Sequence, residues 1–224
     1  MAITLDTAGS VSTDAARGTV TLTIGVGANQ ALVVNTGAWG GSGQKTVGTV
    51  YWNTSGGGSV NLTKAVQLET DTVNTAVWHL LAPTTGAGSV IGVLAESGHI
   101  RIGAHSLFGV KQSGQPDAAG SASFSGLANG KTTNLTTVDD QCWIFDAIAD
   151  QSAAMTKAAG QTLSFDFDSS TTTASYKPDV AVGVNSMAWT WTGNEDGCHS
   201  LASYAPAVAA GGARISTLGL MSAG

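Results

Sequence analysis

Two histidines in this sequence are each followed directly by serine and leucine, a pairing that suggests catalysis. His105 and Ser106 lie in GAHSLFGV, and His199 and Ser200 lie in GCHSLASY. An imidazole can accept the proton of a serine and turn its hydroxyl into a nucleophile. Both stretches are predicted strands, however, and successive side chains of a strand point to opposite faces of the sheet. We therefore predict that neither pair is a catalytic dyad.

A triad drawn from distant residues is the other route to serine chemistry, because such groups meet in space and not in sequence. The sequence contains no G-x-S-x-G stretch, which is the signature of a serine nucleophile at a strand-to-helix turn. No catalytic residue is predicted, and the chain is expected not to be an enzyme.

Paired carboxylates could hydrolyse glycosides, and oxygen-rich loops could bind calcium. The pairs are Asp139 with Asp140, Asp166 with Asp168, and Glu195 with Asp196. In FDFDSS the two phenylalanines alternate with the aspartates, as in an ordinary amphipathic strand with its carboxylates in water. The DxDxDG spacing of a calcium loop is absent. A glycan hydrolase is the weakest of the functions considered.

Histidine and cysteine spacings predict no metal site and no cofactor. The histidines stand at positions 79, 99, 105 and 199, without the spacing of two ligands on one helix. The two cysteines, Cys142 and Cys198, match no zinc motif. Free packed thiols are the favoured interpretation for them, and a disulfide is the alternative.

Aromatic side chains raise the possibility of carbohydrate binding, because flat rings stack on sugar rings. The six tryptophans are at positions 39, 52, 78, 143, 189 and 191. Large aromatics in β-sandwiches more often belong to the core. Trp39 is the exception that we single out as a candidate glycan contact, since it lies in the glycine-rich stretch TGAWGGSGQ.

Charge and hydropathy restrict the classes of partner that we expect for this chain. The chain has 224 residues, 9 of them Lys or Arg and 15 Asp or Glu, for a net charge of −6. The basic residues are spread singly, so nucleic-acid binding and attraction to lipid headgroups are not expected. The N-terminal stretch lacks the basic start and apolar run of a secretory signal, and no stretch approaches 18 apolar residues.

The elements that must position these residues are predicted strands, bounded by Gly, Asn, Asp and Ser as in a β-sandwich. The first series is predicted at 19–25, 30–37, 47–53, 59–66, 75–82, 89–95 and 99–110, and the second at 131–138, 141–149, 161–167, 173–177, 184–192 and 197–206. A helical turn is predicted at 150–158, capped by Asp150.

The two series resemble each other at two places. ANQALVVNT at 28–36 is similar to DDQCWIFDA at 139–147, and a GxHSL motif closes each series. Two halves of one sandwich, with loops of unequal length, would produce this pattern. Chance similarity in a sequence of low complexity is the alternative.

Several stretches, taken in order, resemble one group of domains. They are LVV (32–34), TVYWN…LTKAV (50–66), AVWHLLAPTTGAGSV (76–90), GAHSLFGVKQSGQP (103–116), QCWIFDA (141–147) and SMAWTWTG (186–193). Their order is similar to that of the glycine-rich jelly-roll β-sandwich domain of bacteriophage virion structural proteins, also seen in bacterial surface proteins. His105 and the Leu107–Phe108 pair depart from the family pattern.

The resemblance implies an all-β fold, a single antiparallel β-sandwich of jelly-roll, concanavalin-like type over residues 19–207. Residues 1–18 would form an N-terminal arm with a first strand, and residues 208–224 a C-terminal tail held by a neighbouring subunit. The implied function is that of a non-enzymatic virion protein, a capsid decoration or a head or tail fibre component. Its partners would be other virion proteins and copies of itself. The alternative is a carbohydrate-binding module that attaches to a host-surface glycan.

Overall fold

Strands account for the regular structure of this chain. The computed structural model describes residues 1–40, 45–150, 154–166 and 172–208, and every regular element within these residues is a β-strand. All pairings between the strands are antiparallel. The all-β class and the antiparallel sheets predicted from the sequence are therefore confirmed.

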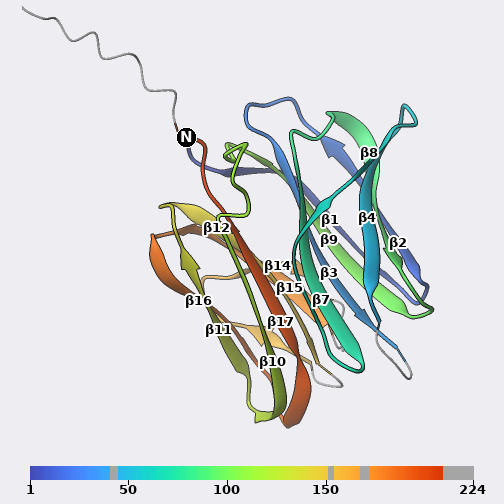
Figure 1. Ribbon diagram of the computed structural model, residues 1–224, viewed down its shortest axis with the longest axis vertical. Helices are drawn as coiled ribbons and strands as arrows, with labels where there is room; N and C mark the ends of the chain where they lie inside the picture. Colours follow the sequence, from blue (N-terminus) through green and yellow to red (C-terminus); the bar gives the residue numbers. More distant parts are fainter. Residues whose placement is uncertain (41–44, 151–153, 167–171, 209–224) are drawn as a thin grey trace, which may run out of the picture.

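The first nine strands form a packed pair of sheets, which we call the first sandwich (Figure 1). The strands are β1 (Thr4–Thr13), β2 (Arg17–Ile24), β3 (Ala31–Trp39), β4 (Val47–Thr54), β5 (Ser59–Asn61), β6 (Thr63–Glu69), β7 (Val73–Leu81), β8 (Gly86–Leu94) and β9 (His99–Phe108). The first inner sheet has the order β1-β9-β3-β7-β6, and the first outer sheet has the order β2-β8-β4-β5.

The other eight strands form the second sandwich. The strands are β10 (Ala118–Ala128), β11 (Lys131–Thr137), β12 (Cys142–Asp150), β13 (Thr156–Lys157), β14 (Thr162–Phe165), β15 (Thr172–Val180), β16 (Gly183–Thr190) and β17 (Asn194–Tyr204). The second inner sheet has the order β10-β17-β12-β15-β14, and the second outer sheet has the order β11-β16-β13.

Both sandwiches pair the beginning of their segment with its end. In the first, β1 pairs with β9, β2 with β8 and β3 with β7. In the second, β10 pairs with β17, β11 with β16 and β12 with β15. The two halves thus correspond strand by strand, and the two GxHSL motifs lie on the corresponding strands β9 and β17. Among the described residues, the second sandwich has no counterpart of β5.

The first sandwich closes over its own apolar core. Strand β2 alternates between exposed and buried residues, so that Leu22 and Ile24 point inward. They belong to one cluster with Trp52 of the outer sheet and with Trp78 and Ile102 of the inner sheet. Full burial of such side chains stabilises the fold by about 1.5–3 kcal/mol each.

The second sandwich has a smaller core in two parts. Ile144 and Met187 pack in one cluster near one end. Phe124, Ile148 and Trp189 pack in another. Both clusters join strands of the second inner sheet to strands of the second outer sheet, so this half buries its own apolar faces as the first half does.

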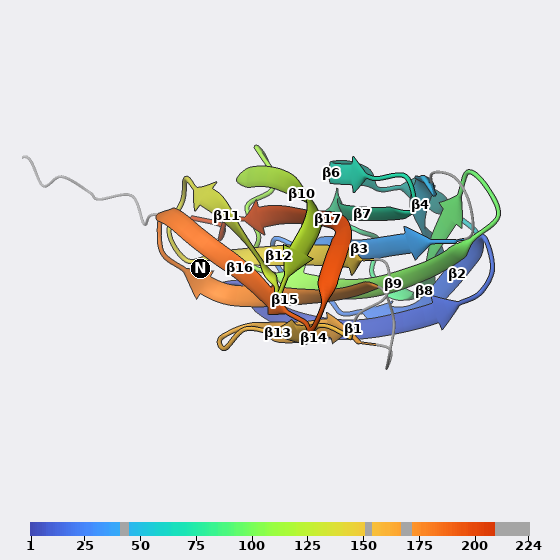
Figure 2. The same cartoon turned by 90° about the horizontal axis from the view of Figure 1, so that it is seen from below.

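The two inner sheets pack face to face, which gives the molecule four layers of strands (Figures 1 and 2). We call this interface the junction. Its centre joins Val33, Val77 and Leu107 of the first inner sheet to Phe145 and Tyr204 of the second. Both faces of the central strands of each inner sheet are therefore buried, one in a sandwich core and one in the junction.

Two glycines let the inner sheets approach closely. A Cβ at Gly37 would lie 1.7 Å from Cγ2 of Thr172. A Cβ at Gly103 would lie 2.8 Å from the ring of Phe165. Contacts this short are not tolerated by real side chains, so the glycines shape the junction.

The arrangement departs from the predicted single sandwich, since the described residues form four sheets and not two. The runs 31–34 and 142–145 are buried at every position, because each lies on an inner sheet with both faces covered. Such continuous apolar runs are the sequence signal of a doubly buried strand.

Two strands, β10 and β13, were not predicted, and one predicted helical turn is wrong. Strand β10 consists largely of Ala, Gly and Ser and lies at the edge of its sheet, so its apolar alternation is weak. The first strand expected within residues 1–18 corresponds to β1, at the edge of the first inner sheet. At the predicted turn 150–158, residues 154–158 contain the short strand β13 and no helix, while 151–153 lie outside the described residues.

The N-terminal segment lies against the end of the second sandwich. Residues 4–13 form β1, an edge strand of the first inner sheet. The amino group of Met1 donates a hydrogen bond to the carbonyl oxygen of Ala207, at a distance of 2.8 Å. The predicted tail 208–224 lies outside the described residues except for Val208.

Candidate functional site

The first His-Ser pair is divided between the two faces of β9. His105 points into the junction, where its ring lies 5.3 Å from that of Phe145 and 5.4 Å from that of Tyr176. Ser106 points the other way and donates a hydrogen bond to Asp6, at 2.9 Å. The prediction that His105 and Ser106 point to opposite faces of their strand is confirmed.

The second pair is also divided, but in the opposite sense. His199 points into the core of the second sandwich, where it contacts Asp146 and Thr133. Ser200 points into the junction and donates to the carbonyl oxygen of Thr75, at 3.1 Å. The same tripeptide thus presents its histidine to the junction in one half and to a sandwich core in the other.

A hydroxyl, an imidazole and a carboxylate stand in line around His199, as they do in a catalytic triad. Nδ1 of His199 lies 3.0 Å from the hydroxyl oxygen of Thr133, and Nε2 lies 2.9 Å from Oδ2 of Asp146. Asp146 and His199 are completely buried, and Thr133 is 7% exposed. A substrate cannot reach these atoms, so the arrangement is structural.

Asp146 is the centre of this buried polar network. Its Oδ1 accepts hydrogen bonds from the backbone N–H and the hydroxyl of Ser175, and its Oδ2 accepts one from Trp189 Nε1. Gln161 donates to the same Ser175 hydroxyl. A buried carboxylate is tolerated when donors surround it in this way. Sequence analysis did not single out Asp146, although its position in the apolar run CWIFDAIA is an available signal.

Two aspartates of the carboxylate pairs considered from the sequence have separate partners in the structure. Asp139 forms an ion pair with Lys111, at 3.0 Å. Asp196 accepts a hydrogen bond from the backbone N–H of Gly126, and Asp168 lies outside the described residues. In the described part of the chain, no three His, Cys, Asp or Glu side chains converge as metal ligands.

Both cysteines are free thiols, in agreement with the favoured prediction. Cys142 packs in the core of the second sandwich, whereas Cys198 packs beside the junction. Burial raises the pKa of each thiol to about 12. Thiols in this state are poor nucleophiles, because the thiolate is the reactive form.

Trp39 lies at one end of the junction and is half-buried. Its ring stacks on that of His99 with centroids 4.9 Å apart, and the Arg101 guanidinium lies 4.1 Å from its centroid. His99 also contacts Asp14, at 2.8 Å. The neighbouring side chains therefore occupy part of the ring surface that a sugar would need, and residues 41–44 of the loop lie outside the described residues.

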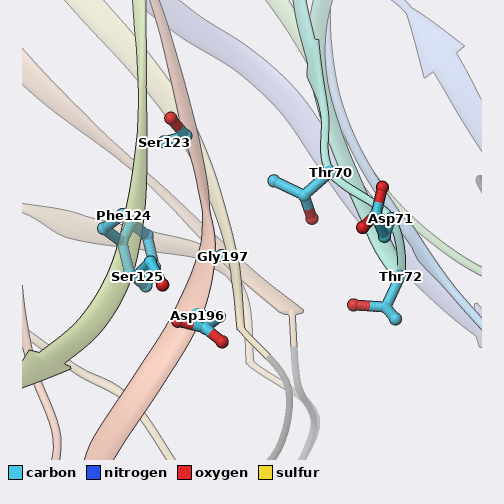
Figure 3. Close-up of a pocket in the computed structure, with 8 residues that line it drawn as sticks. All are labelled: Thr70, Asp71, Thr72, Ser123, Phe124, Ser125, Asp196 and Gly197. Carbon is cyan, nitrogen blue, oxygen red and sulfur yellow. The ribbon is translucent and has the colours of Figure 1, made fainter.

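A cleft opens where the edges of the two sandwiches meet, near the same end of the junction as Trp39 (Figure 3). Its volume is about 420 Å³. The residues that line this junction cleft are Thr70, Asp71, Thr72, Ser123, Phe124, Ser125, Asp196 and Gly197. The turn between β6 and β7 forms one wall, and β10 with β17 forms the other.

An irregularity in β10 shapes the second wall. The register between β10 and β17 shifts between Phe124 and Leu127, and Gly126 adopts a positive φ of 58°. Its backbone N–H donates to Asp196 at 2.6 Å. Bulges of this kind often redirect side chains beside binding sites.

Asp196 is held as an ionised acceptor at the rim of the cleft. Hydrogen bonds from the Ser125 hydroxyl and from the Gly126 N–H lower the pKa of its carboxyl group. Gly197 follows directly, and a Cβ there would lie 2.0 Å from the carbonyl oxygen of Ala149 and 2.6 Å from the ring of Phe124. Glycine at position 197 therefore lets β17 pack closely against Ala149 and Phe124.

Known proteins offer no guide to the junction cleft. Searches against protein-family models, curated proteins and solved structures find no match. Within the described residues, no helix has the length and apolar character of a membrane span.

Proposed function

We propose that this chain is a non-enzymatic structural protein of a bacteriophage virion, either a capsid decoration or a component of a head or tail fibre. The observation that carries the proposal is the fusion of two sandwiches through a buried junction into one block of four layers. The central strands of both inner sheets are covered on both faces, which suits a protein that must keep its shape outside the cell. Its partners would be other virion proteins and copies of itself.

The fold that this proposal assigns to each half is a jelly roll. The nested pairings of β1 with β9, β2 with β8, β3 with β7 and β4 with β5 support the assignment, because a jelly roll forms when a long antiparallel hairpin wraps into two sheets. The corresponding nested pairs of the second half support it as well.

The burial of the reactive side chains supports the proposal that the protein is not an enzyme. The carboxylate of Asp146 and the imidazole of His199 contact each other in a core that is closed to solvent. His105 is enclosed by aromatic rings, and the two thiols are buried and protonated.

Composition of purified virions tests the proposal. We expect an antibody raised against this chain to label intact particles, and peptides from it to co-purify with the major capsid protein at a fixed ratio through a density gradient. Particles that lack the chain under both measurements would overturn the proposal.

The second candidate function is attachment to a surface carbohydrate. The junction cleft favours it, since most of the side chains that line this cleft carry polar groups and it lies at the boundary between two sandwiches, a common place for ligand sites. Trp39 is the glycan contact that the sequence predicts. A glycan array probed with the purified chain tests this function, and a blank array would reject it.

A further inference from the structure

The junction cleft has walls from two different sandwiches, so its shape depends on the packing between them. Thr70, Asp71 and Thr72 lie on the turn that follows β6, in the first sandwich. Ser123 and Asp196 belong to β10 and β17, in the second. Contacts of β6 with both β10 and β17 hold these walls at a set separation.

Strand alternation explains why polar groups face the cleft. Phe124 points into the core of the second sandwich, where its ring stacks on Trp191 with centroids 5.2 Å apart. Its neighbours Ser123 and Ser125 point to the opposite side, toward the first sandwich. Figure 3 shows Ser123, Ser125 and Asp196 on one side of the opening and Thr70, Asp71 and Thr72 on the other.

The side chains that face the cleft offer two carboxylates and four hydroxyl groups, and no basic side chain is among the lining residues. Carboxylates accept hydrogen bonds, whereas serine and threonine hydroxyls both donate and accept. These groups favour a ligand that offers several hydrogen-bond donors, such as hydroxyl groups, and bears no negative charge. A volume of about 420 Å³ lies within the range of small-molecule sites and would admit one or two sugar rings.

A divalent cation is a poorer fit to the same residues. Asp71 and Asp196 are the only acidic side chains in the lining, and no group of three or more potential ligands forms in the described residues. The Asp196 carboxylate already accepts hydrogen bonds from Gly126 and Ser125. Calcium takes six to eight oxygen ligands, most of which this cleft would have to supply as water.

We propose that the junction cleft binds an uncharged carbohydrate, with Asp71 and Asp196 accepting hydrogen bonds from sugar hydroxyls on opposite walls. This inference deepens the second candidate function and rests on it. It also moves the glycan site away from Trp39, whose ring is partly covered by His99 and Arg101.

Variants of the cleft test the proposal on an array of neutral, N-acetylated and sialylated oligosaccharides. Ser123→Trp fills the cleft, and we expect it to weaken binding to the neutral oligosaccharides by about tenfold or more. Asp71→Asn and Asp196→Asn each remove one charged acceptor, and we expect a loss of about fivefold to tenfold for each.

Matched controls separate the cleft from the rest of the surface. Thr132→Trp places the same indole on an exposed position of the second outer sheet, and Asp140→Asn removes an exposed carboxylate elsewhere. Both controls should bind the array as the unmodified chain does. Near-ultraviolet circular dichroism and denaturant midpoints confirm that each variant is folded.

The outcomes distinguish the site from the function. An array on which the unmodified chain binds nothing rejects the cleft and the carbohydrate-binding function together. Binding that survives Ser123→Trp but is lost in Trp39→Ala rejects the cleft and leaves that function standing. A preference for sialylated oligosaccharides, or binding that EDTA abolishes and Ca²⁺ restores, rejects direct recognition of an uncharged sugar by the two aspartates.

Discussion

His105 and His199 occupy the same tripeptide on corresponding strands, yet they have opposite surroundings. His199 lies in a sandwich core, and both of its ring nitrogens have polar partners. His105 lies in the junction against Phe145 and Tyr176, and its Nδ1 has no hydrogen-bond partner among the described residues. Because side chains alternate along a strand, a shift of one residue between motif and sheet exchanges the two faces.

The core of the second sandwich and the junction differ in the same way as the two histidines. The core of the second sandwich satisfies its buried charge through Asp146. In the described junction, His79 Nδ1, Trp143 Nε1 and the Tyr204 hydroxyl also lack partners. Unsatisfied buried polar atoms cost stability, so the junction should be the more vulnerable of the two interfaces.

The largest expected effect comes from Asp146→Ala. This change removes the acceptor of four hydrogen bonds, including those from His199 and Trp189, and leaves their donors buried without partners. We expect a loss of about 3–5 kcal/mol in the free energy of unfolding, measured by urea denaturation. A loss below about 1 kcal/mol would contradict the view that this network supports the second sandwich. Asp140→Asn, at an exposed carboxylate, is the matched control.

Acid should weaken the junction through His105. Burial lowers the pKa of His105 from its ordinary value of 6.5 to about 4. The unfolded chain therefore takes up a proton at a higher pH than the folded chain does, so stability is full above pH 6.5 and falls as the pH drops toward 4. With each pKa unit worth ~1.4 kcal/mol, the loss over this range is about 3 kcal/mol.

The register partners of His105, Ala8 and Val33, carry no charge that could offset its protonation. Burial also lowers the pKa of His79, which acts in the same direction. His105→Leu should flatten most of the decline when urea midpoints are compared at pH 7 and pH 4.5. A variant that keeps the full decline would assign the acid sensitivity to other groups.

Gly37→Ala tests how closely the inner sheets must approach. The added methyl group would overlap Cγ2 of Thr172, and we expect a loss of about 1–3 kcal/mol in thermal or urea unfolding. Thr172→Ser removes that methyl group and keeps the hydroxyl. In a double-mutant cycle, the cost of Gly37→Ala should fall by at least half in the Thr172→Ser background. Additive costs would show that the two positions do not press on each other.

The two serines of the tripeptides provide the smallest and sharpest test. Ser200→Ala removes a buried hydroxyl that contacts both the carbonyl and the hydroxyl oxygen of Thr75, and it should cost about 1–2 kcal/mol. Ser106→Ala leaves Asp6 with its hydrogen bond from Gly25 and should cost about 0.5–1 kcal/mol. Equal losses of stability, or a larger loss for Ser106→Ala, would contradict the view that the Ser200 hydroxyl contributes more in the junction than the Ser106 hydroxyl does in the first sandwich.

Strand positions were largely predictable, because apolar alternation and glycine-rich turns depend on neighbouring residues. The prediction that each histidine is separated from its serine followed from strand geometry alone, and the structure confirms it. Strand β10 was missed, since an edge strand made largely of Ala, Gly and Ser buries little apolar surface and shows no clear apolar alternation. Residues of the junction cleft could not be grouped from sequence, since Thr70 and Asp196 meet only through packing between the sandwiches.

By itself, the sequence determined an all-β chain with two corresponding series of strands, because periodicity and turn residues act over a few positions. The tertiary structure decided which face of each strand would be covered, and by what. Asp146 and His199 are 53 positions apart and meet through the pairing of β12 with β17, while His105 meets Phe145 across the junction. Such contacts depend on the register between strands and on the packing of one sheet against another, which local patterns do not specify.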